Sequence, residues 1–404
     1  MCRILRLGSE LRAFKTVWQH YTLTGEVLWL LEQFRHMLND CIRIGLAENK
    51  TSLRALSLKA YRQLADYDTP SYYKLCAISK AAGILRNYRK ARRRNLRVKA
   101  PYVRRLQLVS CYGLKLKDGC LQIPYRPKQP LRTPLNGHTF ALLSETDVII
   151  RSFTLTPERL SICYAKHVDE LKPHGFVGID SNLENVTLAD SMGRVESYNL
   201  AKPAEIKARY REVKANFKRN DVRVRRRISR KYGRKQREKV ERMLHEVSKR
   251  VVEQANLNRQ GIVMERLTSL RRLYRRGNWQ GHDYRAGMNG WSYAELQRQI
   301  EYKARWLGLP VIYVPPHGSS AKCSICGSRM ARIPEEKRLL RCAACGVTVD
   351  RDVNAARNIL ARGLRFGPFA STSEAMVPEP AASAAIRKVD ADELPSSAQH
   401  APTS

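Results

Sequence analysis

The sequence lacks any run of about 18 apolar residues, the length that a helix needs to cross a bilayer. Its opening, MCRILRLGSE, lacks the apolar core of a secretion signal. Both absences predict a protein of the cytoplasm. With 404 residues, of which 43% are hydrophobic, the chain has room for two to four domains with a sizeable core.

Acidic residues are scarce relative to basic ones. Lys and Arg number 74 against 37 Asp and Glu, which gives a formal net charge of +37. Repulsion of this size destabilises a compact fold unless a polyanion is close. The charge favours nucleic acid as the partner, because neutralising phosphates releases condensed cations. An anionic membrane surface is the alternative that charge alone leaves open.

The ten cysteines are too few for a disulfide scaffold in a chain this long, and six of them are scattered. The other four form two Cys-x2-Cys pairs, Cys323 with Cys326 and Cys342 with Cys345, which fifteen residues separate. This spacing is typical of a zinc site, and the glycine after each pair suits the positive φ of a knuckle turn. Four thiolates leave no position for water, so we expect structural Zn²⁺. Four unpaired or redox-active cysteines are the other interpretation.

The N-terminal part predicts helices beside antiparallel strands. Apolar residues recur at helical spacing in 24–50, 52–67 and 71–93. Strand-like segments follow, with hairpin signals at Lys117-Asp118-Gly119 and at Thr156-Pro157-Glu158-Arg159. We expect a helical lobe joined to a small barrel or sheet.

From residue 175 the pattern changes. Short apolar strands with an acid at or near the end are predicted at 175–180 and 261–267, and the long, strongly basic helical region 203–258 lies between them. An amphipathic helix and a strand precede the cysteines, and a last helix follows them. Residues 367–404 are rich in Ala, Ser and Pro without periodicity, which predicts a disordered tail.

Three acids stand beside apolar residues, where an unpaired carboxylate is costly to bury. Asp180 ends the first strand, Glu265 lies in the second, and Asp352 stands at the start of the last helix. Three converging carboxylates would hold two Mg²⁺ ions about 4 Å apart, an arrangement that hydrolyses phosphodiesters. Each acid alone also fits a cap, a turn or a surface position, and a helix cap is the more frequent role at Asp352. The sequence does not show that the three meet.

Positive charge is densest between residues 223 and 239, where acids are too few to balance it. A solvated helical face is the usual role of such a run, but here we expect a surface that follows phosphates. Tyr210, Phe217 and Tyr232 are interleaved with the charges and fit either base stacking or a core. The predicted nucleic-acid contacts are Arg223, Arg225, Arg226, Arg227, Arg230, Lys231, Arg234 and Lys235.

At these residues the sequence resembles the TnpB (OrfB) family of insertion-sequence proteins, RNA-guided nucleases related to type V CRISPR effectors. GID at 178–180 resembles the first RuvC motif of the family, MERL at 264–267 the second, and DRDVNAARNI at 350–359 the third. The cysteine pairs stand where the family carries its zinc ribbon. After GID the family usually has Leu-Gly, whereas this chain has Ser181-Asn182.

The resemblance implies an α+β multidomain fold. Residues 1–170 would form an N-terminal β-barrel (the wedge) with an inserted helical recognition lobe, whose helices lie at about 24–95. An RNase H-like (RuvC) domain would follow in 171–320 and 349–366, interrupted by the zinc ribbon at 321–348. The resemblance also implies that Asp180, Glu265 and Asp352 are catalytic and bind Mg²⁺, with Asp350 as the alternative to Asp352.

The implied function is an RNA-guided DNA endonuclease of a transposable element. Its partners would be a guide RNA and a target DNA, with base pairing reading the target and region 203–258 beside the duplex. The alternatives are a catalytically inactive RNA-guided DNA binder, a compact type V CRISPR effector, and a DNA transposase. The transposase lacks support from any nucleophilic tyrosine motif. We expect a prokaryotic cytoplasm, the nucleoid when DNA is bound, and either a monomer or a dimer on one RNA.

Overall fold

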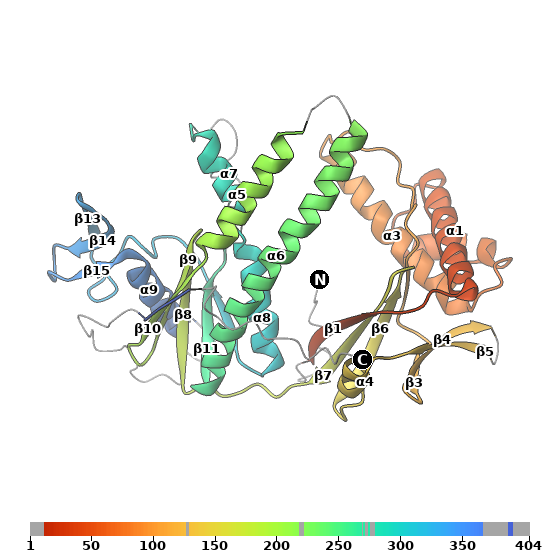
Figure 1. Cartoon of the computed structure of the whole chain (residues 1–404), viewed down its shortest axis with the longest axis horizontal. Helices are drawn as coiled ribbons and strands as arrows, with labels where there is room; N and C mark the ends of the chain where they lie inside the picture. The colour runs from red at the N-terminus through yellow and green to blue at the C-terminus, as the bar shows by residue number, and fades with distance from the viewer. Residues whose placement is uncertain are drawn as a thin grey trace. The chain divides into compact units, whose positions relative to one another are not determined.

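The computed structural model describes the backbone of residues 12–126, 129–217, 222–268, 270, 274, 279–366 and 387–390. The chain divides into two compact units, Met1–His167 and Val168–Ser404. Each unit contains both helices and sheets, so the predicted α+β class is confirmed (Figure 1). Among the described helices, none has the length and apolar composition that crossing a membrane requires.

The predicted helical lobe is present in the N-terminal unit. It comprises α1 (Gly25–Ala47), α2 (Leu53–Ala60), a short 3-10 turn (Arg62–Leu64) and α3 (Ser71–Arg93). The Thr24 hydroxyl caps α1, as predicted, by accepting a hydrogen bond from the backbone N–H of Val27. Leu30, Phe34 and Leu38 recur at steps of four along α1 and are almost fully buried, which places one apolar stripe inside the lobe.

Seven strands of this unit form two antiparallel sheets. The order of the first is β1 (Arg12–His20), β7 (Arg159–His167), β6 (Val148–Leu155) and β2 (Leu108–Ser110), and that of the second is β3 (Lys115–Lys117), β4 (Cys120–Arg126) and β5 (Gln129–Pro134). The short helix α4 (Gly137–Leu143) precedes β6. Because β1 pairs with β7 along its whole length, the three helices are an insertion between paired strands. No ladder between the described strands of this unit joins the two sheets into a closed barrel.

Both predicted hairpins of this unit are confirmed. Asp118 and Gly119 have φ of +50° and +69°, as a two-residue turn of type I′ requires, and they connect β3 to β4. Thr156 N donates to Arg159 O at 3.0 Å and closes the turn between β6 and β7.

One six-stranded mixed sheet organises the C-terminal unit. Its order is β12 (Val311–Val314), β11 (Gln260–Glu265), β8 (Gly175–Ser181), β9 (Asn185–Asp190), β10 (Val195–Asn199) and β16 (Arg387–Asp390). β8, β9 and β10 form an antiparallel meander, whereas β11 pairs parallel to both β8 and β12. The parallel strands β8 and β11 therefore end at the same edge of the sheet.

The predicted tail differs from the structure at four residues. Arg387–Asp390 form β16, which pairs parallel to the edge strand β10. An open edge presents unpaired backbone groups, and this segment satisfies one row of them even though its composition carries no strand periodicity. The rest of the predicted tail, 367–386 and 391–404, lies outside the described residues.

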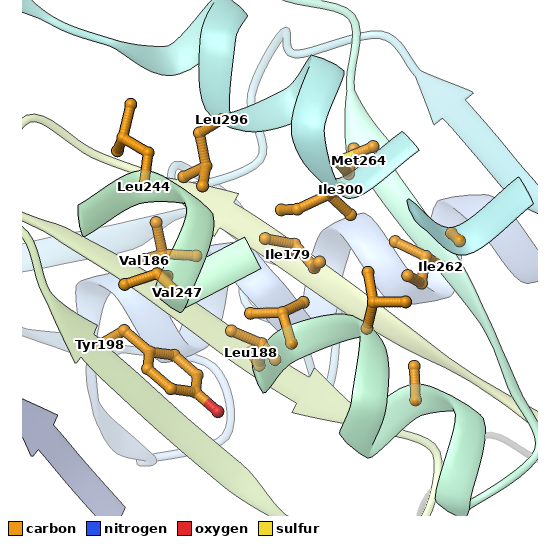
Figure 2. Close-up of a cluster of buried hydrophobic side chains, with 14 of the residues drawn as sticks. Ile179, Val186, Leu188, Tyr198, Leu244, Val247, Ile262, Met264, Leu296 and Ile300 are labelled. Atoms are coloured by element: carbon orange, nitrogen blue, oxygen red, sulfur yellow. The ribbon is translucent and has the colours of Figure 1, made fainter. Parts of the chain in front are cut away.

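Helices pack on both faces of this sheet, with α6 (Val222–Leu257) and α8 (Tyr293–Trp306) on one face and α9 (Arg351–Phe366) on the other. Two further helices, α5 (Ala201–Ala215) and α7 (His282–Gly290), contact each other, and α5 packs against α6. Figure 2 shows Ile179 and Ile262 of the sheet packed with Val247 of α6 and Ile300 of α8. Burying each such side chain contributes about 1.5–3 kcal/mol, so this cluster fixes the strands that carry Asp180 and Glu265.

The opposite face of the sheet packs against α9. Strand side chains alternate, so Phe176 contacts the Ile359 and Leu360 side of α9 while Ile179 faces the other layer. At Gly178 a Cβ atom would lie 2.3 Å from Ala356 O, so only glycine lets α9 approach this closely. The glycine of the GID segment thus brings the start of α9 close to β8.

A small three-stranded sheet precedes α9. It consists of β13 (Met330–Ile333), β14 (Glu336–Cys342) and β15 (Thr348–Asp350), in that order. β15 continues directly into α9, so the segment with the cysteines is joined to this helix without a linker.

Candidate functional site

The four predicted cysteines form one compact cluster. Cys323 Sγ lies 3.7 Å from Cys345 Sγ, and Cys326 Sγ lies 3.5 Å from Cys342 Sγ. All four sulfur atoms lie within 4.8 Å of one another, and no other such group of His, Cys, Asp or Glu donors occurs in the described residues. Tetrahedral Zn²⁺ with bonds of about 2.3 Å needs sulfur atoms about 3.8 Å apart. The cluster therefore has the donors and the spacing of a structural zinc site.

Two matching turns build this cluster. Gly327 N donates to Cys323 O at 3.0 Å, and Gly346 N donates to Cys342 O at 2.9 Å. The two glycines have φ of +77° and +71°, which side chains with a Cβ rarely adopt. The expectation of positive φ at both knuckles is confirmed.

The three predicted acids meet at one edge of the large sheet. Asp180 ends β8, Glu265 ends the neighbouring parallel strand β11, and Asp352 lies in the first turn of α9, which packs on both strands. Their residues are 7%, 7% and 8% exposed. Burial raises the pKa of Asp180 to about 7, and the negative charges of Glu265 and Asp352 add to this rise. Asp180 therefore lies close enough to both other acids to feel their negative charges.

One carboxylate oxygen of this site lacks a hydrogen-bond donor. Glu265 Oε1 is buried and has no hydrogen-bond partner among the described residues. Burial also raises the pKa of the Glu265 carboxyl, although Ser319 and Arg362 oppose the rise. A buried acceptor without a donor is rare unless an ion or water completes it. The oxygen donors present are those that Mg²⁺ prefers, so the residues fit such an ion.

Asp350 and Asp352 have different tasks. Asp350 Oδ1 accepts from the backbone N–H groups of Asp352 at 2.8 Å and Val353 at 3.2 Å, so Asp350 is the cap of α9. The capping role that the sequence left open at Asp352 therefore belongs to Asp350. The Asp352 carboxylate points instead to the edge where Asp180 lies, and it accepts from Asn185 Nδ2 at 2.8 Å.

The family model described as "Cas12f1-like, TNB domain" matches residues 293–359, which include the cysteine cluster and Asp352. A TnpB-like protein of Methanocaldococcus jannaschii is 31% identical over 228 residues, which cover 54% of this chain and 80% of that relative. The chain belongs to the TnpB-like family.

Two further similarities connect this TnpB-like chain to Cas12f. A CRISPR-associated endodeoxyribonuclease Cas12f1 of Sulfoacidibacillus thermotolerans is 34% identical over 116 residues, which are 28% of this chain and only 25% of that protein. The cryo-EM structure of a Cas12f1–sgRNA–target DNA complex matches 83% of this chain and 82% of that one with a TM-score of 0.58. At 15% identity this match shows a shared fold.

One residue at the carboxylates of the TnpB-like chain was not predicted. Arg338, on β14 of the cysteine segment, donates through its guanidinium to Asp352 Oδ2, and its Nε lies 3.7 Å from Asp350 Oδ2. Its side chain is 67% exposed, so solvent screens the ion pair. In the sequence Arg338 is one of several basic residues of the ribbon, and no signal distinguishes it.

A row of polar residues on α9 holds the segment that leads into the first knuckle. Asn354 Oδ1 accepts from Ser324 N at 2.9 Å, and Asn354 Nδ2 donates to Lys322 O at 2.7 Å. Asn358 Nδ2 also donates to Lys322 O, at 2.8 Å. Positions 354, 358 and 362 share one helix face, and this spacing is the signal that would have predicted the contact.

The predicted nucleic-acid contacts lie on the first half of α6, and all eight are exposed. This half has no buried residue before Val240, and it lies beside α5 (Figure 1). The ring centroid of Tyr232 lies 6.0 Å from that of Tyr210 and 6.2 Å from that of Phe217. These half-buried rings therefore stabilise the helix pair and leave the basic side chains outside, and base stacking stays a prediction.

Proposed function

We propose that this chain is an RNA-guided DNA endonuclease of a transposable element, which cleaves target DNA by hydrolysis at a RuvC-type site. Asp180, Glu265 and Asp352 are the proposed catalytic residues and Mg²⁺ ligands. The observation that carries the proposal is their convergence: three buried carboxylates at one sheet edge, with a Glu265 oxygen that has no donor among the described residues.

The topology of the C-terminal unit supports an RNase H-like domain. An antiparallel meander, β8-β9-β10, continues through the parallel strands β11 and β12, with helices on both faces. In the proposal, the first acid comes from β8, the second from β11 and the third from the helix after the ribbon. The N-terminal unit, in the same proposal, supplies the wedge and the recognition lobe that hold the guide RNA.

The chemistry divides between the ions and the chain. Two bound Mg²⁺ ions would lower the pKa of an attacking water and neutralise charge on the leaving oxygen. The chain positions the three carboxylates. The Asn182 amide donates to Asp180, and the Asn185 amide donates to Asp352. The exposed Arg338 side chain also pairs with Asp352.

Zinc has a structural task in this proposal. Four thiolates fill a tetrahedral shell, so the ion has no open position for water or substrate. The joint between the first knuckle and Asn354 then ties the folded ribbon to the helix that carries Asp352.

The excess charge supports nucleic acid as the partner. The net charge of +37 and the exposed basic half of α6 suit contacts with phosphates, which position a duplex without reading its sequence. Sequence recognition is therefore assigned to base pairing between guide RNA and target DNA.

The test is cleavage by the full chain purified with the RNA that copurifies with it. Matched DNA should be cut in Mg²⁺, mismatched DNA should remain intact, and Asp180→Ala should leave matched DNA bound and uncut. A wild-type complex that binds matched DNA but leaves it intact at every Mg²⁺ concentration would instead be an RNA-guided binder. Strand-transfer products would indicate a transposase, and cleavage that survives Asp180→Ala would refute the triad.

A further inference from the structure

The turn between β8 and β9 supplies one amide to each aspartate of the site. Asn182 Nδ2 donates to Asp180 Oδ2 at 2.8 Å, and Asn185 Nδ2 donates to Asp352 Oδ2 at 2.8 Å. The four-residue stretch 182–185 thus holds two acids that come from different elements, and Arg338 also donates to Asp352.

This turn is itself fixed from two sides. Asn182 N donates to Asn185 O at 2.9 Å, which closes the turn. Trp291 Nε1 donates to Asn182 O at 2.7 Å, and the Trp291 ring packs 4.7 Å from the ring of Tyr293 at the start of α8. Lys207 of α5 donates to Gly290 O and Ser292 Oγ on either side of this tryptophan. The backbone of Asn182 is therefore tied to α5 and α8.

A neutral amide suits this task better than a charged donor does. Rotation of a carboxylate about its last torsion is broad, so a hydrogen bond to one oxygen is what selects an orientation. An amide provides that bond without adding a positive charge that would compete with a cation. Removing the hydrogen-bond partner of a metal-binding side chain typically lowers metal affinity or activity 10- to 100-fold.

We infer that Asn182 is a positioning residue, which orients Asp180 for a divalent ion, and that Trp291 holds Asn182 in place. This inference rests on the proposed Mg²⁺ site. It concerns a feature of this chain, because the Leu-Gly pair usual after GID in the TnpB family has no side-chain donor where Asn182 stands. The amide also lowers the pKa of Asp180 against the larger effect of burial, which is consistent with its bond to the ionised form.

The experiment measures Mn²⁺ binding to the purified full chain by electron paramagnetic resonance, with Asp180→Ala defining the signal from this site. Asn182→Ala should raise the Mn²⁺ dissociation constant about tenfold. Asn182→Ser keeps a residue that favours turns but is too short to reach Asp180, and it should have the same effect. Trp291→Phe removes the N–H donor but keeps a smaller aromatic ring, and it should raise the constant about two- to threefold.

Asn289→Ala is the matched control, because the exposed Asn289 amide donates to Arg285 O within its own helix and to no other group among the described residues. The Mg²⁺ dependence of DNA cleavage provides the second readout: the Asn182 variants should need about tenfold more Mg²⁺ for half-maximal rate and approach the wild-type rate at saturation. A merely structural role would lower the rate at every Mg²⁺ concentration.

The outcomes separate the inference from the function it rests on. If both Asn182 variants bind Mn²⁺ like the wild type while Asp180→Ala abolishes the signal, the positioning role is refuted and the metal site stands. If Asp180→Ala leaves Mn²⁺ binding unchanged, the proposed metal site is wrong and the inference fails with it. Equal effects of Asn182→Ala and Asn289→Ala would also refute the positioning role.

Discussion

The two clusters of the C-terminal unit that suit metal ions are built in opposite ways. The four cysteines come from two similar turns in one short segment, and their sulfur atoms already lie 3.5 and 3.7 Å apart in pairs. The three acids come from two strands and a helix, and burial raises the pKa of Asp180, with the negative charges of Glu265 and Asp352 adding to the rise. One cluster is local and compact, whereas the other depends on the packing of the whole sheet.

This difference determines what each ion would contribute. The ribbon has little apolar core of its own, formed around Met330 and Leu340 beside the cysteines, and small segments of this kind need metal to fold. The carboxylates rest on the large cluster between the sheet, α6 and α8, so their framework does not need an ion. In the proposed function, the thiolates therefore support structure and the carboxylates support chemistry.

Asp180→Ala tests the carboxylate side of this comparison and should have the largest effect. We expect DNA cleavage to fall about a thousandfold or more, because the residue is assigned a ligand role in the reaction itself. Folding should be preserved, since the change removes a charge from a repulsive cluster. Single-turnover cleavage and circular dichroism measure the two effects. Asp283→Ala, a change at an exposed position on α7, is the control that should cut normally.

Cys326→Ser tests the thiolate side. We expect loss of bound zinc and of ordered ribbon structure. Cleavage should fall about 10- to 100-fold, because Asn354 binds the ribbon and Arg338 of the ribbon binds Asp352. Zinc content is measured by mass spectrometry and local order by hydrogen exchange. Cys111→Ser, at an exposed cysteine outside the cluster, should change neither quantity. If Cys326→Ser keeps both an ordered ribbon and normal cleavage, the coupling between the clusters is refuted.

The sequence predicted the local cluster more completely than the distributed one. The Cys-x2-Cys spacing and the glycine after each pair determine the knuckles almost alone, so both donors and turn geometry followed from a short pattern. For the acids, the strand ends predicted the edge of the sheet, but their approach depends on Gly178, whose missing Cβ lets α9 pack on β8. Which of two aspartates caps α9 depends on its first turn, and the sequence offered both.

Features that follow from three-dimensional packing escaped prediction for physical reasons. Arg338 reaches Asp352 because β14 and β15 pair in one particular register, which a run of basic residues does not encode. β16 pairs with the open edge of β10 although the composition of its segment carries no strand periodicity. The hairpins of the N-terminal unit were predictable because Asp-Gly is a local signal, whereas the pairing of β1 with β7 spans the whole helical insertion.

A pH series sharpens the comparison by testing whether the ionised carboxylate of Asp180 lowers the stability of the fold without Mg²⁺. Asp180 has an ordinary pKa of 3.8 when unfolded and about 7 when folded, so the folded chain holds an extra proton between these values. Stability should therefore fall as pH rises from about 4 to 7, by about 2–4 kcal/mol at the upper end. Thermal unfolding of the wild type and Asp180→Asn, without added Mg²⁺, measures this as a growing difference in favour of the variant.

Saturating Mg²⁺ should reverse that difference at pH 8, because the ion binds the wild-type carboxylate and stabilises the folded state. Wild type and Asp180→Asn with parallel stability curves across the whole pH range would mean that the acids do not repel one another in the folded chain. The distinction between the two clusters would then reduce to the identity of their donors.

Replacing a single basic residue outside both clusters should have the smallest effect of these changes. Each exposed arginine on the first half of α6 contributes at most one phosphate contact, unlike a metal ligand whose loss empties a site. Arg226→Ala and Arg230→Ala should each weaken binding of a guide–target duplex about two- to fivefold and reduce its salt slope by about 0.9. Arg250→Ala, exposed on the second half of the same helix, is the control.

The cleavage rate at saturating nucleic acid should be unchanged in all three variants, because α6 contributes none of the three acids. A rate that falls in Arg226→Ala while binding and salt slope stay constant would place this helix in the reaction itself, and the separation of chemistry, structure and nucleic-acid binding among three regions would be wrong.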